Sequence, residues 1–265
     1  VSILVKESSK ANQYLDQTKY IDKILILERD GSSNRHDGFF GSLNLIKDIK
    51  KHNFDKIFIF NSSIRFNLIA KLSGITEIYQ YPLFKKTKQH IIDAPKKFIK
   101  DKLNLEVNED PKIQIDDELV TGSIKKFQIN KDEINILLGI GGSGPTKRIP
   151  ADKFLNIIEE ISKVKKCKFF LATGKDNEEQ IILKKILGSQ FSNLCIPLDG
   201  LSIKETLPII KNCDVSICND SSFSHLSAAL GIKTITLMAD TPLIYGNYSS
   251  KMFPIIPDGE NTVGH

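Results

Sequence analysis

Residues 134–164 read INILLGIGGSGPTKRIPADKFLNIIEEISKV, and their pattern sets the class of fold. The first seven residues are apolar apart from Asn135, as in a strand that is covered on both faces of its sheet. Glycines and polar residues follow. From residue 151 onward, apolar residues recur three and four positions apart, which predicts an amphipathic helix. Pro150 suits its start because proline is tolerated in the first helical turn. A strand, a loop and a helix in this order are the unit of α/β folds.

The same alternation runs through most of the chain. Short β-branched and aromatic runs predict strands, and stretches with helical spacing lie between them. The predicted strands cover residues 2–5, 23–27, 56–60, 134–140, 168–172, 194–198, 214–218 and 233–238. The predicted helices cover residues 41–52, 64–73, 90–103, 151–164, 176–187, 202–211 and 222–230. Such alternation implies parallel sheets joined by right-handed crossovers.

The pattern breaks between residues 104 and 133, where Pro111 and Gly122 interrupt any clean period. We therefore expect two Rossmann-like domains, at residues 1–110 and 134–265, joined by a linker at 111–133. Two such domains would face each other across a central cleft. The first unit resembles the second unit of a Rossmann-like domain, and the last residues end in a loop, so we expect a protein truncated at both ends.

Composition is that of a globular protein, with 40% apolar and 26% charged residues in a chain of 265. No apolar run approaches the roughly 18–20 residues that cross a bilayer, and no signal peptide is recognisable, so we expect a cytoplasmic protein. The cysteines lack metal-type spacing, which predicts free buried thiols and no metal site. They are Cys167, Cys195, Cys213 and Cys218.

The net charge of +5 is concentrated in residues 84–102, where seven lysines face only Asp93 and Asp101. A local basic patch attracts phosphate-rich partners, so one interpretation is peripheral contact with the inner face of an anionic cytoplasmic membrane. The other interpretation is a solvated helix face.

The first site motif is the glycine-rich loop after residue 138. Gly141 and Gly142 allow backbone N–H groups to approach an anion closely. Ser143 and Thr146 add hydroxyl donors and Lys147 adds positive charge, a combination that suits a diphosphate. The alternative is a structural glycine turn.

The loop also matches G-x-G-x-x-G, so a nicotinamide-dependent oxidoreductase is a second hypothesis. Pro145 directly after the third glycine argues against it, because the helix should already be running there. The next predicted strand, 168–172, is followed by Thr173 and Gly174, with no acidic residue to hold a ribose diol.

The second site motif is the run NDSSFSHLSAALG at residues 219–231. Ser221 or Ser222 suits a helix N-cap, and a helix N-terminus stabilises a phosphate through free N–H groups and its dipole. Asp220 is placed to bind sugar hydroxyls or to orient Lys147. His225 falls about one turn into the helix, where it can face the ligand. A purely structural cap is the alternative.

These residues resemble those of the family 9 glycosyltransferases, such as the ADP-heptose:lipopolysaccharide heptosyltransferases. The family's Lys-Arg-Trp-Pro is similar to residues 147–150, its Leu-x-Gly-x-x-Ser-Leu-x-Glu to 198–205, and its Asn-Asp-Ser-Gly-Pro-x-His to 219–225. The resemblance implies a GT-B fold and inverting transfer, without a metal, from a nucleotide-diphospho-sugar of ADP type. The acceptor would be a lipopolysaccharide-type or other lipid-linked glycan, and no nucleic acid partner is implied.

The resemblance also implies roles for single residues. Lys147 would neutralise the leaving diphosphate, and Asp220 would share the catalytic centre with it. Ser221, Ser222 and His225 would line the donor's diphosphate and sugar, and Glu178 or its neighbour Glu179 would reach the nucleoside.

The chain departs from the family pattern in several places. The family's Gly-Pro is Ser222-Phe223 here, and the family's general base, an aspartate in the first strand–helix loop, has no match in these residues. A non-catalytic sugar-nucleotide-binding domain is therefore a third hypothesis.

Overall fold

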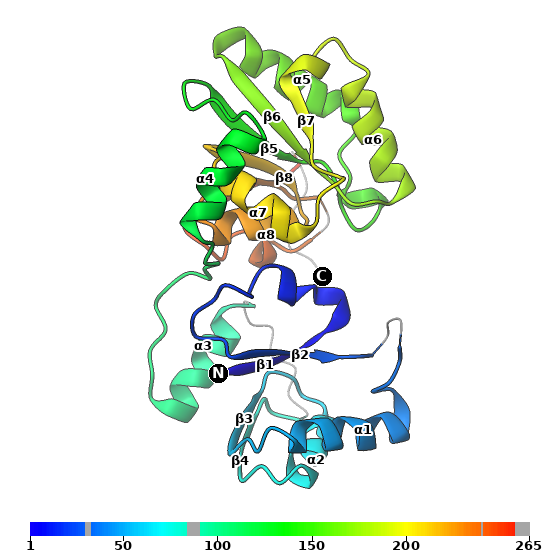
Figure 1. Cartoon of the computed structure of the whole chain (residues 1–265), viewed down its shortest axis with the longest axis vertical. Coiled ribbons are helices and arrows are strands. Elements are labelled where there is room, and N and C mark those ends of the chain that lie inside the picture. The colour runs from blue at the N-terminus through cyan, green and yellow to red at the C-terminus, as the bar shows by residue number, and fades with distance from the viewer. Residues whose placement is uncertain (30–32, 84–90, 240, 258–265) are drawn as a thin grey trace. The chain divides into compact units, whose positions relative to one another are not determined.

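The computed structural model describes residues 1–29, 33–83, 91–239 and 241–257 (Figure 1). Its internal contacts divide the chain into two compact units. The first unit holds residues 1–12 and 19–108, and the second holds residues 13–18 and 109–265.

The second unit is built on one parallel sheet of six strands in the order β10-β9-β8-β5-β6-β7. The strands are β5 (Ile134–Gly139), β6 (Cys167–Ala172), β7 (Cys195–Pro197), β8 (Val215–Asn219), β9 (Lys233–Leu237) and β10 (Met252–Ile255). The helices are α4 (Asp117–Lys126), α5 (Ala151–Val164), α6 (Asn177–Leu187), α7 (Ile203–Lys211) and α8 (Ser222–Ala229). All nine strands and helices predicted for residues 134–265 match elements of this unit, whereas β10 was missed.

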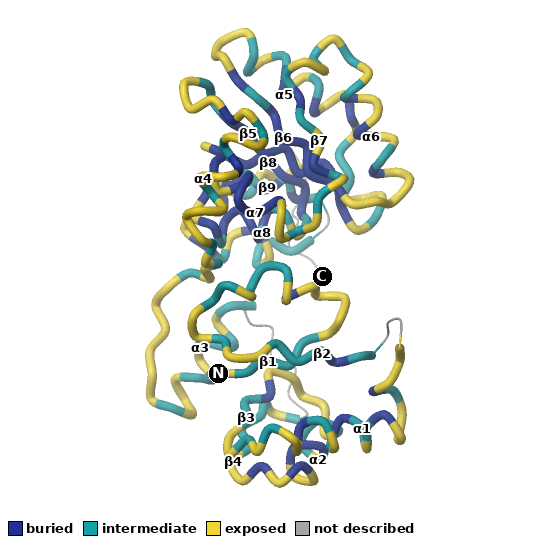
Figure 2. The backbone as a smooth tube through the Cα atoms, in the orientation of Figure 1, coloured by how far each residue is buried: buried dark blue, intermediate teal, exposed yellow. Residues whose placement is uncertain are grey.

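Helices cover both faces of this sheet, as the all-apolar strands predict. Leu137 of β5 faces a core formed with α7 and α8, while its neighbours Ile136 and Leu138 face a second core formed with α5 and α6. The strands lie at the centre of the unit as its most buried elements (Figure 2). Alternate side chains of one strand therefore belong to different cores, which leaves no polar face on β5.

The order of the strands places a topological switch point between β5 and β8. From β5 the chain moves outward through β6 and β7, and it then returns to the other side of β5 to form β8. Both strands are parallel and in register, with Gly139 opposite Cys218. Their carboxyl ends therefore meet at the same edge, where open α/β sheets bind ligands.

Residues 111–133, predicted as a linker without a clean helical or strand period, contain helix α4. Asp116 caps this helix by accepting a hydrogen bond from Glu118 N at 2.9 Å. Asn212 at the end of α7 donates to the Val120 carbonyl at 2.8 Å and to Ser123 Oγ at 2.9 Å. The helix is only 10 residues long and contains a glycine. Its apolar residues therefore do not form a pattern long enough to predict a helix from the sequence.

The first unit contains two pairs of parallel strands around one core. The strands are β1 (Ser2–Lys6) with β2 (Lys23–Leu27), and β3 (Lys56–Ile59) with β4 (Glu77–Gln80). The helices are α1 (Gly38–Lys50), α2 (Ile64–Leu72) and α3 (Asp93–Leu103). Leu27, Leu45, Ile59 and Ile69 come from different elements and meet in this core. Strand β4 was not predicted.

All four cysteines are free and buried, as expected. Burial raises the pKa of the Cys195 thiol to about 11 and that of Cys218 to about 12. Within the described parts of the chain, no helix is both long and apolar enough to cross a membrane.

The close pairing of β5 and β8 leads to a test with two glycines. A Cβ at Gly139 would lie 2.6 Å from Cys218 Sγ, so Gly139→Ala is expected to destabilise the protein by about 1–3 kcal/mol. Gly122 in α4 has nothing within 4 Å of such a Cβ, so Gly122→Ala is expected to stabilise by about 1 kcal/mol. Urea unfolding of both variants measures the difference, and equal effects would contradict the packing at β5.

Candidate functional site

The buried carboxylate of Glu179 holds the glycine-rich loop that follows β5. Glu179 of α6 accepts a hydrogen bond from Gly142 N at 2.7 Å and one from Thr173 Oγ1 at 3.4 Å. A Cβ at Gly141 would lie 2.9 Å from the same carboxylate. Only glycine lets the backbone approach this closely. Glu179 therefore shapes the loop, and the approach of Glu178 or Glu179 to a nucleoside stays a prediction.

Arg148 fastens the other end of the loop. Its Nε donates to the Gly142 carbonyl at 2.8 Å, and its Nη1 pairs with Glu178 Oε2 at 2.7 Å. Its Nη2 lies 3.3 Å from Asp176, the residue that caps α6. The Arg148 side chain is 14% exposed and that of Glu178 is 70% exposed. The guanidinium thus joins the loop to the start of α6, and Glu178 lies at the surface beside it.

The loop after β8 meets the glycine-rich loop directly, as the sequence predicts for a shared site. The amide of Asn219 donates to the Ile140 carbonyl at 2.9 Å. Lys147 Nζ lies 2.6 Å from Asp220 Oδ2, and the Asp220 side chain is 5% exposed against 25% for Lys147. The predicted orientation of Lys147 by Asp220 is present, so a buried carboxylate holds a half-buried ammonium between the two loops.

Polar groups near the start of α8 have no hydrogen-bond partner among the described residues. Ser221 stands at the N-cap position, as expected, but its hydroxyl makes no capping hydrogen bond. Among the described residues, Ser221 Oγ and Asn219 Oδ1 are buried and find no hydrogen-bond partner. Ser222, the first residue of the helix, is exposed. Buried polar groups are normally paired, so such atoms at a switch point indicate a place that a ligand completes.

His225 faces this centre from the first turn of α8. Its Nδ1 lies 2.7 Å from Tyr248 Oη, and the two rings stack at 5.5 Å. Burial lowers the pKa of His225, Asp220 opposes that shift, and Lys147 adds to it. The sequence does not predict a role for Tyr248, because this residue lies 23 positions after His225 and belongs to no recognisable pattern.

The two remaining predicted donors, Ser143 and Thr146, lie exposed on the glycine-rich loop. Neither side chain bonds another described residue, so both hydroxyls are open to a ligand. In the described part of the chain, no three His, Cys, Asp or Glu side chains are placed to hold a metal ion.

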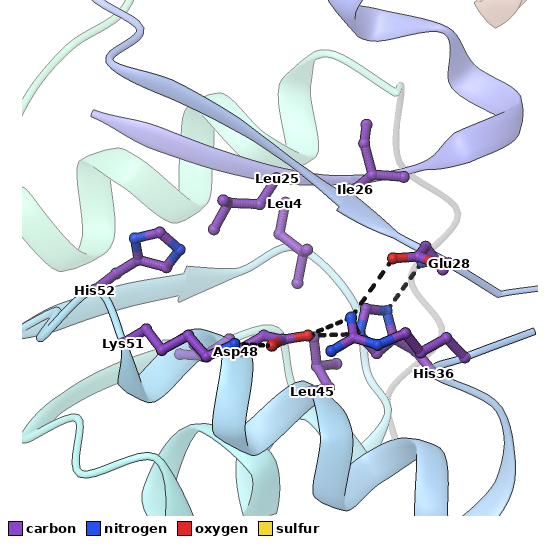
Figure 3. A pocket seen from close by; sticks show the side chains of 11 residues that line it. Leu4, Leu25, Ile26, Glu28, His36, Leu45, Asp48, Lys51 and His52 are labelled. Atoms are coloured by element: carbon purple, nitrogen blue, oxygen red, sulfur yellow. Dashed lines mark hydrogen bonds and ion pairs between the residues drawn. The ribbon is translucent and has the colours of Figure 1, made fainter. Parts of the chain in front are cut away.

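A separate pocket of about 350 Å³ lies in the first unit (Figure 3). Leu4 and Leu25 form one wall, and charged side chains form the other. Asp48 pairs there with Arg35 at 2.5 Å and Lys51 at 2.8 Å. These charges satisfy one another, and the Arg35 hydrogen bond holds the pKa of Asp48 well below its usual range. This closed network contrasts with the unpaired polar groups at the β5–β8 switch point.

A doubly wound parallel sheet with glycine, hydroxyl and lysine donors at its switch point is the architecture of nucleotide-dependent α/β enzymes. Comparison with known families specifies the class further. The family model described as Glycosyltransferase family 9 (heptosyltransferase) matches residues 44–253, so this chain belongs to that family.

Individual relatives agree. The chain is 23% identical over 248 residues to lipopolysaccharide heptosyltransferase 1 of Campylobacter coli, covering 83% of this chain and 71% of that protein. A family 9 glycosyl transferase from Veillonella parvula superposes with a TM-score of 0.79 at 17% identity, covering 98% and 79% of the two chains. The E. coli heptosyltransferase WaaC with ADP superposes with a TM-score of 0.65 at 11% identity, covering 98% and 94%.

The family, the GT-B fold and the glycosyltransferase class predicted from the sequence are thereby confirmed. Family membership also decides against the nicotinamide-dependent oxidoreductase. The roles of single residues toward a ligand stay predictions.

The depressed pKa of His225 has a consequence for stability. Native His225 takes up a proton less readily than an unfolded histidine, whose pKa is about 6.5. The lowered pKa of His225 therefore contributes to the free energy of unfolding above about pH 6.5. This contribution is lost as the pH falls through and below that value. Between about pH 7.5 and 5.5, we expect the wild type to lose more unfolding free energy than His225→Gln. Urea midpoints at both pH values measure the loss, and equal losses would show that His225 is not buried as a neutral ring.

Proposed function

We propose that this chain binds an ADP-linked heptose, or a closely similar nucleotide-diphospho-sugar, at the β5–β8 switch point. It transfers the sugar with inversion to a lipopolysaccharide-type or other lipid-linked glycan. The observation that carries this proposal is the Lys147–Asp220 pair, 2.6 Å apart, which joins the two loop tips in a member of family 9.

The proposed diphosphate position follows from the donors around that pair. Two phosphoryl groups placed between the glycine-rich loop and the start of α8 would receive backbone N–H groups from both. Ser221 Oγ has no described partner, and Ser222 is exposed beside it. The positive end of the α8 dipole favours the same place. Gly141, Gly142, Ser143 and Thr146 would cover the phosphates from the other side.

The proposed chemical role of Lys147 and Asp220 is to stabilise the leaving nucleoside diphosphate. As the bond between the anomeric carbon and the diphosphate oxygen breaks, negative charge grows on the nucleoside diphosphate. The Lys147 ammonium has three donors, so it can keep Asp220 and meet a phosphate oxygen at the same time. A preorganised charge of this kind costs no reorganisation during the reaction. Asp220 is also proposed to accept hydrogen bonds from sugar hydroxyls.

Inversion follows if the acceptor oxygen attacks the anomeric carbon from the face opposite the departing diphosphate. The acceptor would therefore lie away from Lys147 and the start of α8. No residue of this chain is assigned as the base that takes the acceptor's proton. The ADP type of donor is supported by solved structures of the E. coli relative WaaC, with ADP and with ADP-2-deoxy-2-fluoro heptose. Glu178 is proposed to face the nucleoside from the start of α6.

Nucleotide titration tests the proposal directly. We expect ADP to bind with a Kd well below about 1 mM and more tightly than UDP or GDP, by calorimetry. With ADP-heptose and a lipid-linked acceptor, NMR of the product should show the anomeric configuration opposite to that of the donor. Absence of binding by every nucleoside diphosphate at about 1 mM would refute the proposal.

Lys147 allows a sharper test with a matched control. Lys147→Met removes the charge and keeps much of the stem, so we expect ADP affinity to fall about 10–100-fold. Lys153 of α5 is exposed and lies outside both loops, so Lys153→Met should leave affinity unchanged. If both variants bind ADP like the wild type, Lys147 does not contact the diphosphate.

The basic segment 84–102 is proposed as a peripheral contact with an anionic membrane. Lys85, Lys86 and Lys88 lie outside the described residues, and the remaining four lysines lie on or beside α3. Each lysine near an anionic surface is worth about 1 kcal/mol.

Vesicle sedimentation tests this contact. Changing Lys85, Lys86 and Lys88 to Gln should weaken binding to anionic vesicles at low salt by about tenfold or more. The same change at the exposed residues Lys153, Lys165 and Lys175 of the second unit serves as the charge-matched control. Equal weakening in both sets would indicate net charge alone, and the segment would lose its special role.

A further inference from the structure

Tyr248 contacts the candidate site through a histidine. The phenol follows the short helix Leu243–Tyr245 and reaches back to α8. Its Oη lies 2.7 Å from His225 Nδ1. The two ring centroids are 5.5 Å apart and the ring planes differ by 15°, so the rings also stack. One side chain thus restrains both the hydrogen bonding and the plane of the imidazole.

The protonation states of His225 and Tyr248 follow from their burial and from the hydrogen bond between them. Burial lowers the pKa of His225, and burial raises the pKa of Tyr248 to about 12. Both groups are therefore neutral near pH 7. A neutral imidazole has one donor and one acceptor nitrogen. If the phenol donates its proton to Nδ1, the histidine proton must stay on Nε2.

The other ring nitrogen is left for a ligand. Among the described residues, none forms a hydrogen bond with His225 Nε2. The charged groups that act on the ring are Asp220 and Lys147, the pair that joins the two loops. Because Nδ1 is engaged by Tyr248, Nε2 is the ring nitrogen that remains for a ligand, and its protonation decides whether it attracts or repels a phosphate oxygen.

We propose that Tyr248 is a positioning residue: its hydroxyl locks His225 in the tautomer that carries hydrogen on Nε2, and its ring fixes the plane in which that N–H points at the donor diphosphate. The inference rests on the proposed function for the identity of the ligand, but the tautomer itself does not depend on it.

The lock has a physical advantage for this site. The opposite tautomer would present a lone pair to phosphate oxygens, which is repulsive. A protonated imidazolium would bind phosphate but would also place a second cation beside Lys147. A neutral N–H donor avoids both. Partners that orient a ligand histidine in this way are worth 10–100-fold in metal sites, where they have been measured.

Tyr248→Phe is the discriminating variant because it keeps the stacked ring and removes the hydroxyl. Ring-nitrogen NMR of protein labelled in its five histidines, with His225→Gln for assignment, reads the tautomer directly. We expect wild-type His225 to carry hydrogen on Nε2 alone and Tyr248→Phe to show both tautomers. We expect ADP affinity and donor kcat/KM to fall about tenfold in the variant.

Two controls separate positioning from general damage. Tyr245→Phe removes a hydroxyl from the same segment at a residue that is 38% exposed, and it should change neither tautomer nor affinity. In a His225→Gln background, Tyr248→Phe should cause no further loss of ADP affinity, because the residue it positions is gone. A positioning role requires this coupling, whereas a purely structural role does not.

The proposal is overturned if wild-type His225 carries its hydrogen on Nδ1. It is also overturned if Tyr248→Phe binds ADP like the wild type, or loses the same affinity with and without His225. Failure of the proposed function has a different signature, since the wild type itself would then bind no nucleoside diphosphate while the NMR measurement still reports the tautomer. That measurement on the wild type also decides the matter if a variant does not fold.

Discussion

The parallel pairing of β5 with β8 is the constraint on which the rest of the second unit depends. The two strands come from opposite halves of the sheet, yet they are direct neighbours and end at the same edge. Gly139 makes this approach possible because any side chain there would collide with Cys218. Both loops that carry the candidate site leave the sheet from this edge. Their encounter, and the Lys147–Asp220 pair that results, are consequences of strand order.

Around that edge, buried polar groups are divided into two kinds. Glu179 and Arg148 are engaged in shaping the glycine-rich loop, which they bond at both the amide and the carbonyl of Gly142. A buried carboxylate is stable only when donors surround it, so the loop and Glu179 support each other. Ser221 Oγ and Asn219 Oδ1, by contrast, are buried and unsatisfied among the described residues. The rigid part of the site is therefore the protein's own framework, and the unsatisfied part is where a ligand would supply the missing bonds.

The first unit uses the same chemistry differently. The charged residues of its pocket, centred on Asp48, satisfy one another, and its core joins two separate strand pairs. Charge density by itself therefore does not mark a ligand site. The pattern that does is a set of buried polar groups without partners among the described residues, at a place where the fold brings two loops together.

Local sequence determined a large part of this structure. Runs of β-branched residues and helical periods placed most strands and helices, because buried elements need apolar residues on each face that packs. Short or weakly patterned elements were not predicted, because β4, β10 and α4 have few residues and no clear period. The glycine-rich loop and the run from Asn219 were recognisable because their residue types have few other uses after a buried strand.

Tertiary structure alone decided which of these residues meet. Neighbouring glutamates such as Glu178 and Glu179 are equivalent in the sequence, but helix geometry turns one into the loop and the other toward the surface. Tyr248 became part of the site because the chain returns past α8 after the last helix turn, a path that no local pattern records. Sequence patterns report which faces of an element are buried, whereas partners across the fold depend on strand order and register, which only the folded chain defines.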